Sequence, residues 1–314
     1  MPDRRFPDGV APSPDHIRAG ILAYAAGDAL GVPWEGKTPD DVEWEKLEEL
    51  PARGDWPRGS TSDDTDQVLL VARCLVETGG QVDEREFLTR LAKALPRMRG
   101  VGPTTRAAVE RFVETGEPCA SEGSSIGAAM RALPFGWATP VAAAEQRREL
   151  TFRLSRATHG DPVAIMSACA VAEMAAWAIE QHPIDTVVAA GLREADRLTR
   201  QYALDSAAVR PLREASAGDW ALPKGGMRLD AVATMAIVLH VLRQATGLAS
   251  AMKQAVALGG DTDTAAAIVG GILGSQAGDI EGQIPWLSSV VLPESEMVEA
   301  TAAGLCALRR SFHQ

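Results

Sequence analysis

The sequence has few cysteines, and none is spaced as in a metal or redox motif. Its four cysteines, Cys74, Cys119, Cys169 and Cys306, form no C-x-x-C pair, and three of the four lie within apolar stretches of helical periodicity. A small buried thiol is the common state of such residues. This cysteine usage excludes a disulfide-stapled fold, and we expect the protein to reside in the reducing cytoplasm.

The sequence also lacks a targeting segment and a long hydrophobic run. Its first eleven residues, MPDRRFPDGVA, contain no apolar signal-peptide core. The stretch that stands out as most apolar, residues 231–242, is too short to cross a bilayer and contains His240. We therefore expect neither export nor insertion into a membrane.

The chain has fewer basic residues than acidic ones. The chain has 31 Lys and Arg against 42 Asp and Glu, which gives a formal net charge of −11. Such a field repels phosphate polyanions, so we expect no bulk binding of nucleic acid.

No stretch alternates with period two for the length of a strand. Apolar residues recur at helical spacing instead. Glycine and proline punctuate these segments without a shift in composition that would mark a linker. We predict an all-α fold, a single compact multi-helix domain over residues 15–314 after a flexible segment 1–14, and a monomer. The expected helices cover residues 17–30, 68–76, 86–98, 104–114, 162–181, 185–202, 230–244, 248–258, 264–275 and 294–310.

Two clusters of acids and hydroxyls, about two hundred residues apart, each open an apolar helical run. The first is Ser62-Asp63-Asp64-Thr65-Asp66, and the second is Gly259-Gly260-Asp261-Thr262-Asp263-Thr264. Each cluster alone is explained by helix capping, since Ser and Asp are preferred N-cap residues. A cap needs only one acceptor, however, and the extra carboxylates repel one another unless a cation offsets their charge.

If the two clusters meet in the fold, they make a metal site of oxygen ligands. Four converging carboxylates carry a charge of about −4, which two divalent cations neutralise. A calcium EF-hand does not fit, because the positions that need glycine and glutamate hold Ala266 and Ile272. With no His or Cys near either cluster, magnesium or manganese is favoured over zinc or copper.

Two short motifs point to other enzyme classes. Residues 31–38 match the P-loop pattern G-x-x-x-x-G-K-[ST], but a helical run precedes them and Pro33 removes a backbone donor. Residues 123–127 match G-x-S-x-G, the nucleophile elbow of serine hydrolases, but they follow a loop instead of a strand. Neither motif has the strand that its function requires.

Five motifs in order resemble the ADP-ribosylglycohydrolase family. They are Gly27-Asp28-Ala29-Leu30-Gly31 with Glu35, then Ser62-Asp63-Asp64-Thr65, then Ser125 to Arg131, then Thr158-His159-x-x-Pro162, and then Gly260 to Thr264. The resemblance implies an all-α fold with two Mg²⁺ ions, sometimes Mn²⁺, in a cleft. It also implies hydrolysis of the bond between ADP-ribose and a modified protein, nucleic acid or small molecule.

The resemblance implies roles for individual residues. Glu35 matches a glutamate near the metals that gates the site or assists proton transfer, and either Asp63 or Glu35 would be the catalytic general base. His159 matches a residue lining the nucleotide pocket, although a histidine at a loop end is equally often a capping or surface residue. The implied metal ligands are Ser62, Asp63, Asp64, Asp261, Asp263 and Thr264. The implied substrate-binding residues are Ser125, Gly127, Ala128, Met130, Arg131 and His159.

One departure from the family pattern concerns the substrate loop. The family has an asparagine where this chain has Ile126, which cannot make the same polar contact. The preferred linkage therefore stays open, as does the leaving group. Two alternatives remain: a crystallin-like protein that binds ADP-ribose without hydrolysing it, and a hydrolase of a ribosylated small metabolite.

Overall fold

The computed structural model describes residues 12–221 and 229–312, and this part of the chain is built from helices. It contains no β-strand, only a single parallel bridge between Ser60 and Val291. The predicted all-α fold is confirmed. The predicted flexible segment 1–14 lies outside the described residues up to residue 11, and α1 begins at Pro14. The α-helices are α1 (Pro14–Gly31), α2 (Asp63–Glu77), α3 (Glu84–Ala94), α4 (Pro103–Thr115), α5 (Gly127–Met130), α6 (Leu133–Ala138), α7 (Ala144–Arg156), α8 (Pro162–Ile179), α9 (Ile184–Gln201), α10 (Arg210–Ala217), α11 (Ala231–Gln244), α12 (Leu248–Ala257), α13 (Thr262–Ala277) and α14 (Val298–Ser311).

Short 3₁₀ helices connect these elements at several places. They are η1 (Val32–Trp34), η2 (Pro39–Asp41), η3 (Trp44–Glu49), η4 (Leu95–Arg97), η5 (Val141–Ala143), η6 (Leu287–Ser289) and η7 (Ser295–Met297). The first three follow α1 directly, so the P-loop-like residues 31–38 begin at the end of an α-helix. The helical context that argues against an NTPase is therefore present in the structure.

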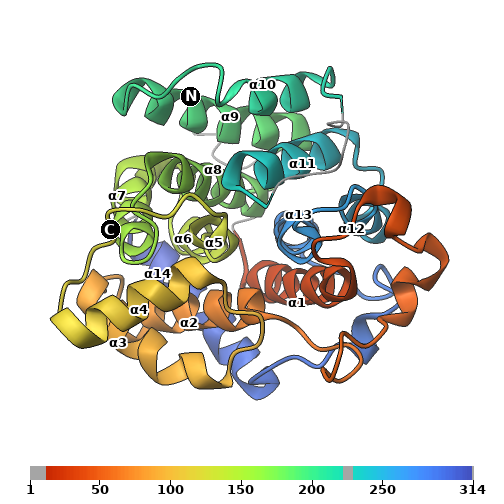
Figure 1. Ribbon diagram of the computed structural model, residues 1–314, viewed down its shortest axis with the longest axis horizontal. Helices are drawn as coiled ribbons and strands as arrows, with labels where there is room; N and C mark the ends of the chain where they lie inside the picture. Colours follow the sequence, from red (N-terminus) through yellow and green to blue (C-terminus); the bar gives the residue numbers. More distant parts are fainter. Residues whose placement is uncertain (1–11, 222–228, 313–314) are drawn as a thin grey trace.

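The helices α1 and α13 pack side by side at the centre of the molecule (Figure 1). Their backbones come close because glycines face the partner helix. A Cβ atom on Gly27 would lie 2.2 Å from the carbonyl oxygen of Ala266, and one on Gly31 would lie 2.3 Å from Cα of Asp263. Only glycine permits this approach. As a result, the end of α1 lies against the beginning of α13.

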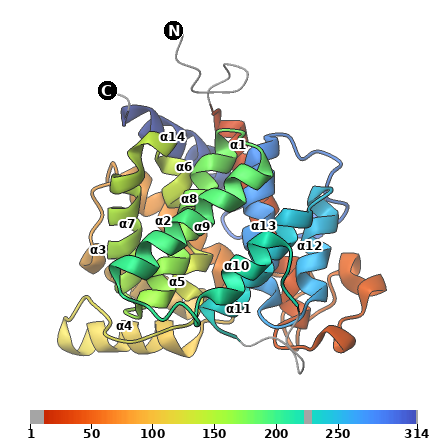
Figure 2. The same ribbon diagram turned by 90° about the horizontal axis from the view of Figure 1, so that it is seen from above.

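The remaining helices surround this pair. The outer helices α9 and α10 cover α8 and α11 (Figure 1), and a view turned by 90° shows the same packing from above (Figure 2). At a mean hydropathy of 1.6 over residues 162–179, α8 is long and apolar enough to cross a membrane by length and composition, whereas α11 is apolar but shorter. The neighbouring helices bury 78% of that window, as expected for the core helix of a globular domain.

Four helices were not predicted from the sequence: α5, α6, α7 and α10. The helix α7 shows why, since its buried face mixes Leu150 and Leu154 with polar residues, Arg147 among them. The Arg147 side chain is 1% exposed, forms an ion pair with Glu173 and donates to the Pro140 carbonyl over 2.8 Å. A helix whose inner face is held by polar contacts has no clear apolar periodicity.

Candidate active site

The structure brings the two acid-hydroxyl clusters together. The hydroxyl of Thr264, in the first turn of α13, donates to Oδ2 of Asp64, in the first turn of α2, over 2.7 Å. The Thr262 hydroxyl donates to the Gly31 carbonyl over 2.8 Å, which fixes the beginning of α13 on the end of α1. Residues two hundred positions apart therefore form one buried site between the beginnings of two helices.

Helix capping does not explain the acids of these clusters. In the first cluster the cap is Ser62, whose hydroxyl accepts from the Asp64 amide over 3.2 Å, so the carboxylates are not needed for it. In the second cluster the N-cap residue is Asp261, whose side chain makes no capping hydrogen bond to any described residue. The carboxylates of Asp63, Asp64 and Asp263 are only 4–5% exposed. Buried acids beyond the cap need another counterpart.

A buried acid that sequence reasoning did not assign, Asp28 of α1, holds the first turn of α2. Its carboxylate accepts from the amides of Ser62 (3.0 and 3.1 Å) and Thr65 (3.1 Å), and from the Thr65 hydroxyl (2.5 Å). The N-terminus of a helix favours such a charge because its first N–H groups are unpaired. A carboxylate in the apolar run of α1 was the signal for this role. Asp28 therefore positions the first cluster.

Burial raises the pKa of every acid at the centre of the site. It raises the pKa of Asp28 to about 6 and that of Asp63 to about 7, despite hydrogen bonds that favour the charged forms. Burial, reinforced by neighbouring carboxylates, raises the pKa of Asp64 and Asp263 well above the usual range of aspartate. In the described part of the chain, no Lys or Arg forms an ion pair with these four acids. The cluster therefore has excess negative charge without a cationic partner.

Glu35 lies beside the second cluster, on the loop that follows η1. Two backbone hydrogen bonds fix this loop: Gly36 donates to the Gly260 carbonyl over 2.8 Å, and Gly260 donates to the Lys37 carbonyl over 2.9 Å. The Glu35 carboxylate is partly exposed and forms an ion pair with Arg53. Its negative charge contributes to the raised pKa of Asp263. Glu35 thus combines closeness to the acids with access to solvent.

The loop that precedes α5 lies between the acids and the beginning of α8. Ser125 is partly exposed, and its hydroxyl lies 2.9 Å from Nε2 of His159. A Cβ atom on Gly127 would lie 2.8 Å from the His159 ring, so this position must be glycine for the histidine to fit. Ser125 and Gly127 are therefore positioned by His159, as the family motifs suggest.

The other residues assigned to substrate binding are buried. Ala128, Met130 and Arg131 are 1–5% exposed. The Met130 carbonyl accepts from the buried Tyr24 hydroxyl over 2.8 Å, and the Arg131 guanidinium contacts protein groups. Ile126 is 4% exposed and belongs to the hydrophobic core. In this arrangement Ala128, Met130 and Arg131 are buried beneath the loop.

The Ser125 and His159 pair does not form the dyad of a serine hydrolase. Burial, together with the nearby charge of Arg131, lowers the pKa of His159 to about 3, so its ring is neutral. Its Nδ1 faces the Thr158 hydroxyl at 2.7 Å, where a catalytic triad has a carboxylate. The G-x-S-x-G match therefore marks a loop of the cleft and no nucleophile elbow.

The donor chemistry of the site fits hard divalent cations. Its ligand atoms are carboxylate and hydroxyl oxygens, and its negative charge is uncompensated. The side chains do not form a finished coordination sphere, since no group of three or more His, Cys, Asp or Glu in the described residues is arranged to hold an ion. The hydrogen bond from Thr264 to Asp64 joins two residues that a cation would take as ligands. The site therefore suits divalent cations by the type of its ligand atoms and by its charge, and not by a completed coordination geometry.

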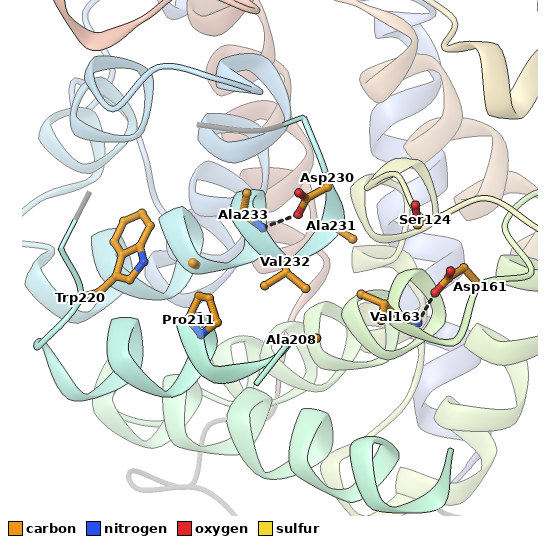
Figure 3. A pocket seen from close by; sticks show the side chains of 11 residues that line it. Ser124, Asp161, Val163, Ala208, Pro211, Trp220, Asp230, Ala231, Val232 and Ala233 are labelled. Carbon is orange, nitrogen blue, oxygen red and sulfur yellow. Dashed lines mark hydrogen bonds between the residues drawn. The ribbon is translucent and has the colours of Figure 1, made fainter. Parts of the chain in front are cut away.

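Two hollows flank the substrate loop. A recess of about 540 Å³ borders residues 120–125 and α4. A pocket of about 450 Å³ lies between the beginning of α8, α10 and α11, where Trp220, Pro211 and Val232 supply an apolar wall (Figure 3). The amide of Ala231 donates to the Ser124 carbonyl over 3.3 Å and connects this pocket to the loop. No pattern in the sequence indicated either hollow.

Comparisons with known proteins agree with this architecture. The family model described as ADP-ribosylglycohydrolase matches residues 11–311. The chain is 28% identical to the ADP-ribosyl-[dinitrogen reductase] glycohydrolase of Rhodospirillum rubrum over 302 residues, covering 94% of this chain and 96% of the relative. It is also 28% identical to an uncharacterized protein of Archaeoglobus fulgidus over 304 residues, covering 93% and 96%.

A solved structure shows the same fold. It is described as an ADP-ribosylglycohydrolase-related protein complex and superposes with a TM-score of 0.77 at 28% identity, covering 94% of this chain and 98% of that chain. The match of the family model over nearly the whole chain and the shared fold lead to one conclusion. The chain belongs to the ADP-ribosylglycohydrolase family.

Proposed function

We propose that this protein hydrolyses the glycosidic bond at the distal ribose of ADP-ribose, and so removes ADP-ribose from a modified substrate, in a reaction that needs two divalent cations, Mg²⁺ or Mn²⁺. The observation that carries the proposal is the contact between Thr264 and Asp64 at 2.7 Å. It joins the two acidic clusters into one site of oxygen ligands, in a chain whose family is named for this hydrolysis.

The residues that would hold the cations are Ser62, Asp63, Asp64, Asp261, Asp263 and Thr264. When bound, divalent cations supply positive charge at the reacting oxygens and lower the pKa of a coordinated water. The buried acids would orient the ribose and stabilise an oxocarbenium-like transition state by their negative charge.

Two carboxylates are placed to accept the proton of the attacking water. Asp63 is buried, with one oxygen held by the Gln67 amide at 2.6 Å and the other free of that contact. Glu35 is partly exposed and is held by Arg53 at the mouth of the site. Both are carboxylates at the acidic cluster and so remain candidates for the general base, and variants of each are needed to choose between them.

The hollows beside the substrate loop support the proposal by giving room for a nucleotide. Thr158 lines the recess along residues 120–125, and Asp161 lines the pocket at Trp220. Apolar walls with a few polar groups are typical of sites for flat ring systems. The nucleotide part of the substrate would lie along this side, and the scissile bond would lie at the acids.

The test is a panel of ADP-ribosylated proteins, nucleic acids and small molecules, assayed with excess Mg²⁺ and with EDTA. We expect turnover of at least one substrate with Mg²⁺ and its loss with EDTA. Replacing Asp261 and Asp263 by alanine should abolish turnover and leave the helical CD spectrum intact. The matched control replaces two exposed acids, Asp185 and Asp279, neither of which lines the recess or the pocket.

Three outcomes would contradict the proposal in different ways. Turnover that survives EDTA would overturn the need for cations. Normal turnover in the variant without Asp261 and Asp263 would remove the acids from the reaction. Calorimetric binding of ADP-ribose with no release from any substrate of the panel would instead identify a binding protein.

A further inference from the structure

Arg131 lies at the centre of a buried hydrogen-bond network that connects the acids to the substrate loop. Its side chain is 1% exposed and lies over the Phe87 ring, with the guanidinium carbon 4.9 Å from the ring centroid. Nη1 donates to Oε1 of Gln67 over 2.8 Å. Nη2 donates to the Leu154 carbonyl over 3.1 Å and to the Thr158 hydroxyl over 2.5 Å. A guanidinium only donates, so it sets the direction of every hydrogen bond beyond it.

The first arm of the network runs from Arg131 to Asp63. Because Arg131 donates to Oε1 of Gln67, the amide group of Gln67 must point its NH₂ the other way. That NH₂ donates to Oδ2 of Asp63 over 2.6 Å, four residues earlier on the same helix. Oδ2 is thereby occupied, and Oδ1 lies on the side of Gly100, where a Cβ atom on that glycine would lie 3.4 Å from it.

The second arm runs from Arg131 to Ser125. The Thr158 hydroxyl accepts from Arg131, so its own hydrogen is free to point at Nδ1 of His159, 2.7 Å away. A neutral ring that accepts at Nδ1 carries its hydrogen on Nε2, which then donates to Ser125 over 2.9 Å. The opposite tautomer would leave the buried Thr158 hydroxyl hydrogen without an acceptor, at a cost in free energy. Ser125 passes its hydrogen toward the Thr104 hydroxyl, 3.5 Å away.

From these contacts we propose that Arg131 is a positioning residue that orients two other groups, Asp63 and Ser125. Through Gln67 it fixes which oxygen of Asp63 is presented to the reacting groups. Through Thr158 and His159 it holds Ser125 of the substrate loop in register with that oxygen. The proposal rests on the proposed function and adds to it an assignment for Gln67 and Arg131, neither of which needs to touch the substrate.

The first arm is tested by Gln67→Glu. Glutamate has the size of glutamine and still accepts from Arg131, but it cannot donate to Asp63. We expect kcat to fall at least about tenfold and KM to change by less than about threefold, because Asp63 loses its orientation while the loop keeps its own. The matched control is Gln276→Glu, which removes a donor to the His182 carbonyl at the far end of α13. The control should keep the kcat of the wild type.

The second arm is tested by Thr158→Val. Valine keeps the shape of threonine and removes the link between Arg131 and His159. We expect the KM and the Kd of ADP-ribose, measured by calorimetry, to rise about tenfold, with kcat changed by less than about threefold. The control is Thr199→Val, since Thr199 is a buried threonine that donates within its own helix to the Ala195 carbonyl. If Thr158 had a purely structural role, its replacement would lower kcat and the affinity for ADP-ribose together.

A stability measurement keeps the first arm testable if Gln67→Glu folds poorly. In the double variant Asp63→Asn with Gln67→Glu, the amide and the carboxylate exchange places, so the hydrogen bond is restored with its donor reversed. We expect Asp63→Asn to raise the unfolding midpoint more in the Gln67→Glu background than in the wild type. An equal or smaller rise in the Gln67→Glu background would overturn the contact between residues 63 and 67.

The outcomes separate this inference from the proposed function. If the wild type turns over an ADP-ribosylated substrate but Gln67→Glu matches its control, the positioning role is wrong and the function stands. If the wild type turns over nothing, the function fails, and the unfolding midpoints together with the calorimetric Kd still decide the network. A loss of kcat and affinity in equal measure in both variants would also refute the assignment of separate effects to the two arms of the network.

Discussion

Asp63 should weaken the folded state of the metal-free protein, so its replacement by asparagine should stabilise that state. Burial raises the pKa of Asp63 to about 7, against 3.8 in an exposed aspartate. The folded protein therefore binds this proton more tightly than the unfolded chain does. As the pH rises from about 4 to about 7, the unfolded chain ionises first, and the free energy of unfolding falls. Above about pH 7 this loss is complete.

The size of the effect follows from the two pKa values. Their difference corresponds to about 4 kcal/mol, which is an upper limit because neighbouring acids share the protons. In Asp63→Asn the side chain is neutral and still accepts from the Gln67 amide, so the substitution removes the charge without removing the contact. At about pH 8 in EDTA, Asp63→Asn should be more stable than the wild type by 1 to about 4 kcal/mol. At about pH 4 the two proteins should be equally stable.

Divalent cations should reduce this advantage of the variant. Mg²⁺ at about one hundred times its Kd would stabilise the wild type by about 2.7 kcal/mol, and the variant, which lacks one ligand, would gain less. The assay is urea unfolding followed by far-UV CD at both pH values, with EDTA and with MgCl₂. The control is Asp205→Asn, an exposed acid away from the site. A variant less stable than the wild type in EDTA at about pH 8 would refute the reasoning, because the protein itself would then stabilise the charge.

Three further predictions follow from the packing and the buried groups. Gly31→Ala should lower the free energy of unfolding by at least about 2 kcal/mol, because its Cβ would lie 2.3 Å from the α13 backbone. The control Gly102→Ala, whose Cβ would have no atom within 4 Å, should change it by less than about 0.5 kcal/mol. Urea unfolding checks both. Ile126→Asn, which restores the asparagine of the family, should lower the unfolding free energy by about 1–3 kcal/mol, since position 126 is 4% exposed in the core; an unchanged midpoint would show that the loop rearranges. The pKa of His159, lowered to about 3, implies stability that is present above about pH 6.5 and lost toward pH 3, so His159→Gln should flatten the acid side of the stability profile, and NMR titration of the ring should show no protonation near neutral pH.

The sequence was sufficient to predict the all-α fold and the two acidic clusters, because both depend on local patterns. Apolar residues at helical spacing identify most of the helices. The clusters stand out since Asp63 and Asp261 lie at the positions where such runs begin. Whether the clusters meet depends on the glycine contacts between α1 and α13, which involve residues with no side chain to form a pattern.

The residues that support the site were harder to predict. Gln67 is a common polar residue on a helix, and only its place four residues after Asp63 hinted at a contact. Arg131 matched a substrate-binding motif, and a charged residue is usually exposed, so its burial could not be foreseen. The helix α7 was missed for the same reason, because its inner face depends on the buried Arg147.

The hydrogen-bond partners of the buried acids distinguish a structural aspartate from the functional ones. Asp28 accepts from three donors at the beginning of α2, namely the Ser62 amide, the Thr65 amide and the Thr65 hydroxyl, so both of its oxygens are held by the protein. Asp64 and Asp263 each accept one, from the hydroxyl and the amide of Thr264. Asp28→Asn should therefore destabilise the protein by about 1–3 kcal/mol both in EDTA and in Mg²⁺, because an amide NH₂ would face N–H donors. Asp64→Asn should instead stabilise the metal-free protein, because it removes a charge that the protein leaves unmatched. If urea unfolding showed the same sign for both variants in EDTA, the acids of this site could not be divided into those that hold the fold and those kept for a ligand.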